Sequence, residues 1–193
     1  MGREFELKYR ATPQQIAAIA ERYPDGRSIT METTYYDTPE RLLSPRHWTL
    51  RRRMENGISV CTLKTPAQGG GRGEWETECE DILSAIPALC KLGAPALLPV
   101  LVSEGVEPVC AARFTRLAST LTWGDSTLEL ALDQGILLGG DRQIPLCEVE
   151  VELKDGTEAA AVAFAEELAE TFGLVSETRS KYRRALSLAQ GQE

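Results

Sequence analysis

HWTLRRRMENGISVCTLKT, residues 47–65, predicts a β-hairpin with Asn56-Gly57 as its turn. A two-residue turn fixes how the two strands pair, and side chains alternate between the two faces of each strand. Arg52 therefore falls on one face of the hairpin. The other face gathers three basic side chains, which are Arg51, Arg53 and Lys64.

Acidic and apolar side chains alternate in several other segments. These segments are residues 3–10, 74–80, 127–133 and 144–153. Strict alternation predicts strands with one apolar and one polar face. Helical spacing is found instead in residues 13–23 and 157–172, and in 82–105 with breaks expected at its prolines. The chain therefore reads as α+β, mainly antiparallel β, with residues 1–193 as a single domain.

Composition excludes several classes of protein. The 193 residues are 42% apolar and carry a net charge of −8, which predicts a folded chain and disfavours nucleic acid as a partner. No apolar run is long enough for a membrane span, and the charged N-terminus is unlike a signal peptide. Five cysteines without a C-x-x-C pair fit a reducing, cytoplasmic environment. The single histidine, His47, disfavours histidine-based catalytic triads and zinc sites.

The polar faces of these strands are sorted by sign. An ordinary sheet with one wet face would alternate in the same way, but its polar face usually mixes both signs with neutral residues. Here like charges stand two residues apart and repel one another unless a ligand neutralises them. Divalent cations suit the carboxylates and phosphate oxygens suit the basic groups. A magnesium polyphosphate supplies both a divalent cation for the carboxylates and phosphate oxygens for the basic groups.

Glu4-x-Glu6-x-Lys8 resembles the E-x-E-x-K signature of CYTH proteins, the triphosphate tunnel metalloenzymes. Matches in the family's order extend the resemblance over residues 4–184. They are Tyr35-Tyr36-Asp37-Thr38, Leu50-Arg51-Arg52-Arg53, Lys64, Glu74, Glu76, Arg116, Glu129, Asp133-Gln134-Gly135, Glu148-Val149-Glu150-Val151-Glu152 and Ser180-Lys181. The resemblance implies a closed eight-stranded antiparallel β-barrel, a tunnel with a charged lumen and helices outside.

The resemblance also implies roles for part of the matching residues. The implied substrate-binding residues are Lys8, Arg51, Arg53, Lys64, Glu74, Glu76, Arg116 and Lys181. The implied ligands of Mg²⁺ or Mn²⁺ are Glu4, Glu6, Asp133, Glu148, Glu150 and Glu152. Catalysis is expected from Glu4, Glu6, Lys8 and Glu150.

Three functions are compatible with this pattern. The first is a metal-dependent inorganic triphosphatase that acts on a small polyphosphate. A homodimeric assembly is compatible with this function. The second is a nucleotide or thiamine triphosphatase, or a class IV adenylate cyclase, on the same scaffold. The third is a non-catalytic module that binds polyphosphate or nucleotide. Trp48 and Trp75 are out of phase with the lumen charges, so no base-stacking platform is evident unless residues 82–105 wall one tunnel mouth.

Overall fold

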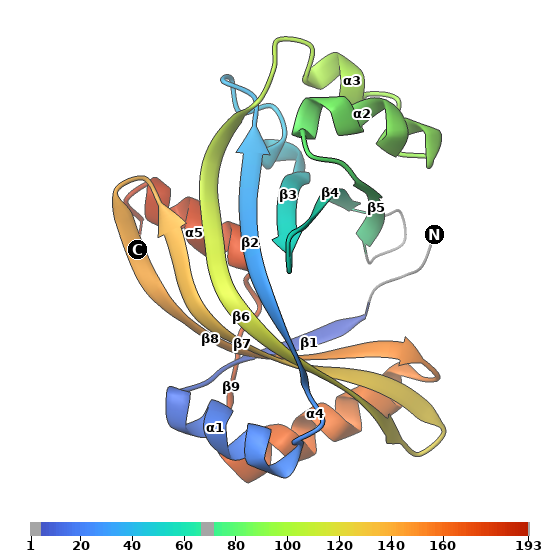
Figure 1. The fold of residues 1–193 in the computed structure, drawn as a ribbon, viewed down its shortest axis with the longest axis vertical. Coiled ribbons are helices and arrows are strands. Elements are labelled where there is room, and N and C mark those ends of the chain that lie inside the picture. Colours follow the sequence, from blue (N-terminus) through green and yellow to red (C-terminus); the bar gives the residue numbers. More distant parts are fainter. Residues whose placement is uncertain (1–4, 67–71, 193) are drawn as a thin grey trace.

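A nine-stranded antiparallel sheet forms the body of the protein in the computed structural model, which describes residues 5–66 and 72–192 (Figure 1). The strands are ordered β5-β4-β3-β2-β6-β7-β8-β1-β9 across the sheet. Their bounds are β1 Glu6–Arg10, β2 Arg27–Asp37, β3 Thr49–Glu55, β4 Ile58–Pro66, β5 Arg72–Glu78, β6 Glu107–Trp123, β7 Ser126–Gly139, β8 Arg142–Asp155 and β9 Val175–Ser176.

The hairpin register predicted from Asn56-Gly57 is confirmed. Arg53 pairs with Val60 and Arg51 pairs with Thr62 across β3 and β4. Asn56 and Gly57 both have positive φ, of 49° and 91°, as a tight hairpin turn of this kind requires. The basic face of the hairpin is therefore set by local sequence alone.

The prediction of a closed eight-stranded barrel is wrong. The sheet has nine strands and curls on itself, but β5 and β9 end it as two edges and are not paired in the described residues (Figure 1). Closure needs continuous hydrogen bonding between the two edge strands, and alternation of side chains carries no information on that pairing. The long strands β6, β7 and β8 supply the curvature that brings the two halves of the sheet face to face.

Helices α1 (Pro13–Arg22) and α4 (Glu158–Phe172) cover the convex face of β1, β7 and β8. Thr12 and Gln15 form the capping box that starts α1. Ile19 and Phe164 pack into a core with apolar side chains of β7 and β8, including Leu130. This packing leaves the charged faces of the three strands directed into the curl.

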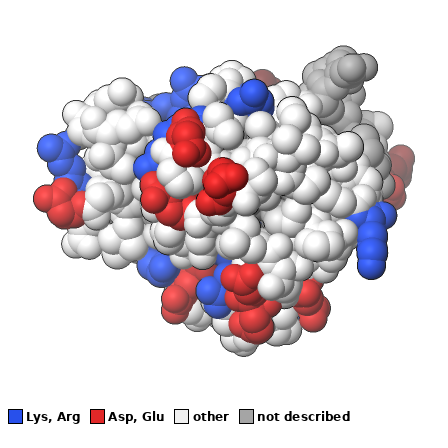
Figure 2. Space-filling model, turned by 90° about the horizontal axis from the view of Figure 1, so that it is seen from above, with Lys and Arg blue, Asp and Glu red and all other residues white. Residues whose placement is uncertain are grey.

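A second core lies under α2 (Ile82–Lys91) and α3 (Leu98–Leu101). The short 3-10 helix η1 (Ser44–Arg46) precedes β3 in the sequence. Trp48 and Trp75 pack into this core, on the side away from the charges, as predicted. The break expected at Pro87 is wrong, because α2 continues through it to Lys91. Seen from above, this end of the molecule has broad areas with few charged side chains beside clusters of acidic and basic ones (Figure 2).

Helix α5 (Lys181–Ala189) lies on the concave side of the sheet. Its Ala185 packs in a core with Phe114 and Leu137, which share strand faces with Arg116 and Asp133 respectively. The first residue of the helix is Lys181, after the N-cap Ser180. The fold thereby brings a C-terminal cation against the concave charged face. No helix in the described part of the chain is long and apolar enough to cross a membrane.

Candidate active site

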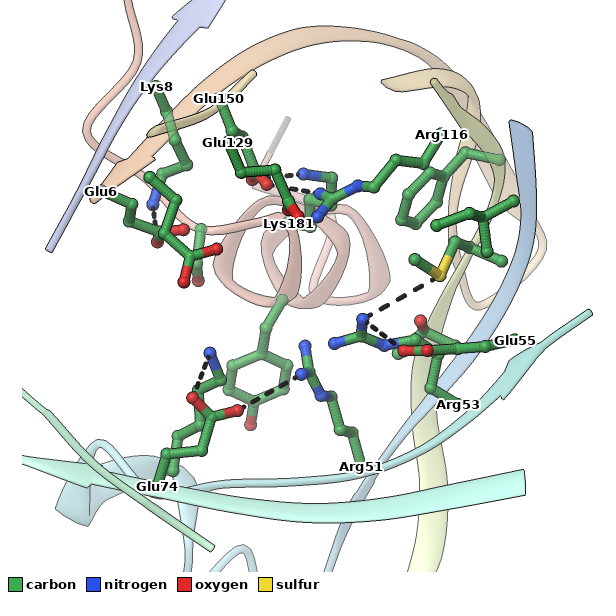
Figure 3. Close-up of a pocket in the computed structure, with 18 of the residues that line it drawn as sticks. Glu6, Lys8, Arg51, Arg53, Glu55, Glu74, Arg116, Glu129, Glu150 and Lys181 are labelled. Atoms are coloured by element: carbon green, nitrogen blue, oxygen red, sulfur yellow. Dashed lines mark hydrogen bonds and ion pairs between the residues drawn. The ribbon is translucent and has the colours of Figure 1, made fainter. Parts of the chain in front are cut away.

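A cavity of about 650 Å³ lies inside the curl of the sheet, and charged side chains make up most of its lining (Figure 3). One wall is formed by β2 to β5, the other by β1, β6, β7 and β8, and the N-terminal end of α5 reaches between them. The charged lining residues are Glu6, Lys8, Arg27, Arg51, Arg53, Glu55, Lys64, Glu74, Glu76, Arg116, Glu129, Glu150, Glu152, Lys154 and Lys181.

The wall formed by β3 and β4 is basic, and two carboxylates, Glu55 and Glu74, lie against it; Arg53 Nη1 is 2.8 Å from Glu55 Oε1. Glu74 serves both Lys64, at 3.2 Å between Nζ and Oε2, and Arg51, at 3.6 Å between Nη2 and Oε1. Within the described residues, the buried Nε of Arg51 has no hydrogen-bond partner. Burial, and then the neighbouring Arg51, lower the pKa of Arg53 to about 10. A bound anion would relieve both conditions.

The opposite wall is acidic, and the strand register explains why. Glu152 of β8 stands between two partners, Glu6 of β1 and Glu129 of β7, so three carboxylates form one row across three strands. Side chains that pair across neighbouring strands lie about 5 Å apart at Cβ. Lys154 partly neutralises the negative charge of this row, because its Nζ lies 2.9 Å from Glu152 Oε1 and 3.8 Å from Glu129 Oε2.

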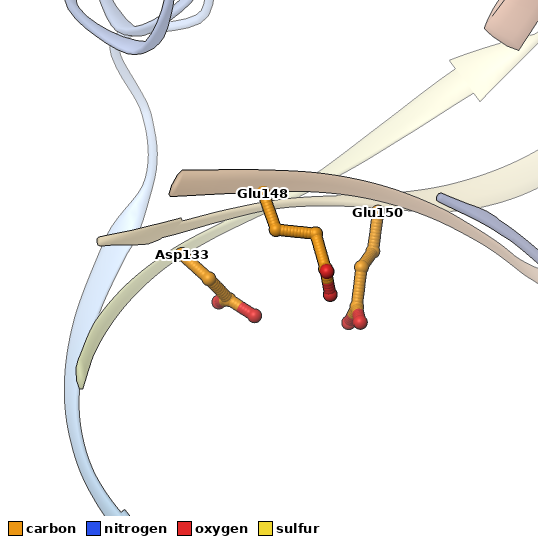
Figure 4. Close-up of side chains that lie close together, drawn as sticks. All are labelled: Asp133, Glu148 and Glu150. Atoms are coloured by element: carbon orange, nitrogen blue, oxygen red, sulfur yellow. The ribbon is translucent and has the colours of Figure 1, made fainter. Parts of the chain in front are cut away.

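Deeper in the curl, Asp133, Glu148 and Glu150 converge (Figure 4). One oxygen from each lies within 4.8 Å of the others. The Nζ of Lys181 occupies this meeting point, 2.8 Å from Asp133 and 2.7 Å from Glu150, and it also contacts Glu148. The Lys181 ammonium thus already fills the position in which these three carboxylates would hold a cation.

Two arginines complete the buried cluster. Arg116 donates to both oxygens of Asp133, each at 2.7 Å, and also contacts Glu150. Arg184 donates to Glu148 at 2.8 Å. Burial raises the pKa of Glu148 to about 7 against the opposing effect of Lys181, while for Glu150 the nearby Lys181 and Arg116 outweigh burial and lower the pKa. Glu150 is therefore ionised and faces the cavity with its charge already paired.

Hard, oxygen-rich donor sets of this kind suit a divalent cation. The row of Glu6, Glu129 and Glu152 fits one best, because its three carboxylates line the cavity. Two lysines pair with them, Lys154 with Glu129 and Glu152, and Lys8 with Glu6 at 2.9 Å. Asp133 and Glu148 are fully buried and do not line the cavity.

A family comparison gives this geometry its context. The family model described as the CYTH domain matches residues 2–186. The chain belongs to the CYTH family. Over its whole length it is 27% identical to a protein named inorganic triphosphatase from Haemophilus influenzae, of which the match covers 56%. Over 66% of its length it is 31% identical to human thiamine-triphosphatase, of which the match covers 51%.

The chain thus spans about half the length of the curated CYTH relatives it matches. Among solved structures, it resembles a Hippeastrum protein studied as an adenylyl cyclase and described as having a dominant triphosphatase activity. The TM-score is 0.65 at 16% identity, with 100% of this chain and 97% of that chain covered. At this identity the likeness establishes the shared CYTH fold.

The structure gathers most of the residues that the CYTH resemblance selected. Those that line the cavity are Glu6, Lys8, Arg51, Arg53, Lys64, Glu74, Glu76, Arg116, Glu150, Glu152 and Lys181. Glu4 lies outside the described residues. Arg52 does not line the cavity, as its phase predicted. Arg113 does not line it either, and its Nε lies 3.6 Å from Glu32 Oε2.

Four further charged residues line the cavity and were not among the expected site residues. Glu129 shares a strand face with Asp133, so its phase was a usable signal. Lys154 likewise continues the face of Glu150 and Glu152, one step beyond the expected end of the strand. Arg27 and Glu55 lie at strand ends, where alternation gives little guidance.

Proposed function

We propose that the cavity binds triphosphate together with Mg²⁺ or Mn²⁺ and hydrolyses its terminal phosphoanhydride bond. The supporting observation is the opposition of two walls: on the basic side, the Nε of Arg51 has no hydrogen-bond partner among the described residues, and the carboxylate row stands on the other side. A metal-bound triphosphate is the small ligand that would satisfy both walls at once. The CYTH relatives named as triphosphatases support the same chemistry.

The basic wall has the task of holding the phosphate chain. Arg51 and Arg53 present several N–H donors each, and Lys64 adds a point charge. Arg116 and Lys181 approach from the other side of the cavity, fixed by the buried carboxylates beneath them. A substrate gripped from both sides is held in a defined position, which lowers the entropic part of the barrier.

Glu6, Glu129 and Glu152 would hold the divalent cation, which when bound draws negative charge from the phosphate oxygens. Carboxylates of the same wall would orient a water molecule toward the terminal phosphorus and accept its proton. Glu150 is a weak proton acceptor because Lys181 and Arg116 hold its pKa down. We therefore assign Glu150 to orienting these two cations and place the proton acceptor in the half-buried row of Glu6, Glu129 and Glu152.

Manganese binding tests the metal assignment apart from turnover. Electron paramagnetic resonance of added Mn²⁺ should show at least about 10-fold weaker binding in Glu129→Gln and Glu152→Gln than in the wild type. Glu167→Gln is the matched control, since Glu167 is half exposed on α4 and pairs with Arg22 at 3.8 Å. Unchanged Mn²⁺ affinity in both row variants would reject the row as the metal site.

Phosphate release tests the reaction itself. Inorganic triphosphate should be hydrolysed in Mg²⁺ or Mn²⁺, and excess EDTA should abolish the activity. Full activity in EDTA would contradict a metal-dependent reaction. Absence of hydrolysis with either metal would instead favour a binding module.

A further inference from the structure

Lys154 bridges two carboxylates of the row formed by Glu6, Glu129 and Glu152. Its Nζ lies 2.9 Å from Glu152 Oε1 and 3.8 Å from Glu129 Oε2, and these two glutamates are direct partners across β7 and β8. Like charges that pair directly across neighbouring strands repel one another. The ammonium of Lys154 therefore offsets this repulsion, and it does so through the same carboxylates that the proposed divalent cation would need.

An irregularity of the sheet occurs at Lys154. Thr127 of β7 pairs with Asp155 of β8, and the next residue, Leu128, pairs with Leu153, so Lys154 has no partner residue on β7 in the described part of the sheet. A β-bulge of this kind inserts one extra residue into a strand and changes the direction of side chains. Leu153 and Lys154 both line the cavity, whereas strict alternation would direct consecutive side chains to opposite faces. The bulge thus helps to place the lysine at the cavity wall.

The cations of this wall differ in how firmly they are held. Lys8, which pairs with the row at 2.9 Å, has a side chain that is 13% exposed. Arg116 is held by buried ion pairs with Asp133 and Glu150. The Lys154 side chain is 41% exposed, so its ammonium can turn to water without losing much hydration. Lys154 is therefore the cation that the row can exchange most easily.

We propose that Lys154 is an exchangeable counter-ion of the metal site, so that its ammonium and a divalent cation compete for the carboxylates of Glu129 and Glu152. The inference rests on the proposed function, because it takes the row as the metal site. A carboxylate that accepts from an ammonium offers less of its charge to a metal ion, so a bound metal must break both Lys154 pairs. Lys154 thereby lowers the affinity for metal and stabilises the fold whenever the metal is absent.

Electron paramagnetic resonance of Mn²⁺ added without substrate measures this competition. Lys154→Met keeps the length of the side chain and removes its charge, and it should bind Mn²⁺ about 10-fold more tightly than the wild type. Lys154→Arg keeps the charge and should stay within about 3-fold of the wild type. Lys91→Met is the matched control, because Lys91 is an exposed residue of α2 that does not line the cavity.

Thermal unfolding separates competition from a purely structural role of Lys154. In EDTA, Lys154→Met should melt about 2 °C below the wild type, because the repulsion between Glu129 and Glu152 is no longer offset. In excess Mn²⁺ the order should reverse, because the more tightly bound cation stabilises the variant more than the wild type. A variant that melts below the wild type by the same amount in both conditions would overturn the inference.

The row variants separate this inference from the proposed function. If Glu129→Gln and Glu152→Gln weaken Mn²⁺ binding but Lys154→Met binds Mn²⁺ no more tightly than the wild type, the inference is overturned and the proposed metal site stands. If both row variants keep the Mn²⁺ affinity of the wild type, the proposed metal site fails, and the inference fails with it.

Discussion

Glu148 should make the stability of this protein depend on pH between the acidic and the neutral range. Its carboxylate is fully buried beside Lys181 and Arg184, yet burial still raises its pKa to about 7. The folded chain therefore holds a proton at this site that the unfolded chain releases at lower pH. Replacing Glu148 with glutamine removes the titrating group while keeping the size of the side chain.

The sign and size of the effect follow from the two pKa values. The pKa is about 7 in the folded chain and 4.5 for an ordinary glutamate. The stabilisation from the bound proton is complete below the lower value, and it is lost as the pH rises through the upper one. The gap between the two values corresponds to about 3 kcal/mol of unfolding free energy. Glu177 and Glu150 have lowered pKa values, so their contributions change below this range.

Urea unfolding followed by circular dichroism, from about pH 5 to pH 8, measures the effect. The wild type should lose about 3 kcal/mol across this range, and Glu148→Gln should remove most of that slope. Glu167→Gln serves as the control because Glu167 is half exposed on the surface. A Glu148→Gln slope equal to that of the wild type would refute the reasoning.

Three further predictions concern the same framework. Gly135→Ala should lower the free energy of unfolding, measured by urea unfolding, by about 3 kcal/mol, because a Cβ at this position would lie 2.1 Å from Arg113 O. Gln134→Ala is the control, since Gln134 is exposed, and an equal loss of stability in the two variants would contradict the packing argument. Glu150→Gln should lower kcat for triphosphate at least about 100-fold because a neutral amide cannot hold Arg116 and Lys181 together, and a near-normal rate would exclude this role. Inorganic triphosphate should have a kcat/KM about 10-fold higher than ATP at one Mg²⁺ concentration. Tyr35 and Phe114 line the cavity but are nearly buried, so their rings offer little surface for stacking on the adenine base. Equal values for the two substrates would contradict this preference.

Local sequence was sufficient to place the basic wall. The Asn56-Gly57 turn fixes the register of β3 and β4, and the register fixes which two of the three consecutive arginines face the cavity. The same alternation placed Glu150, Glu152 and Arg116 on the concave side. These features depend on a period of two residues and on one turn, both of which are written in contiguous sequence.

The burial depth of individual side chains and the closure of the sheet could not be predicted from local alternation. Glu148 and Glu150 share a strand face, but only Glu148 is sealed beneath α5, through contacts with Lys181 and Arg184 more than 30 residues away. The expected barrel failed for a related reason, because the pairing of edge strands depends on the whole sheet. An apolar wall from residues 82–105 at one tunnel mouth was the alternative that the sequence left open; α2 and α3 pack into the second core instead, and neither segment supplies a lining residue to the cavity.

The most direct test of the account compares Arg51→Ala with Arg52→Ala in the hydrolysis of inorganic triphosphate with Mg²⁺. The Arg51 side chain lines the cavity and is 14% exposed. Arg52 lies on the other face, where its Nε donates to Ser59 Oγ at 3.0 Å. Arg51→Ala should lower kcat/KM by about 100-fold through the loss of charge-assisted phosphate contacts, and Arg52→Ala should change it less than about 3-fold. An Arg51→Ala enzyme as active as the wild type, or an Arg52→Ala enzyme with the greater loss, would contradict the assignment of the cavity as the triphosphate site.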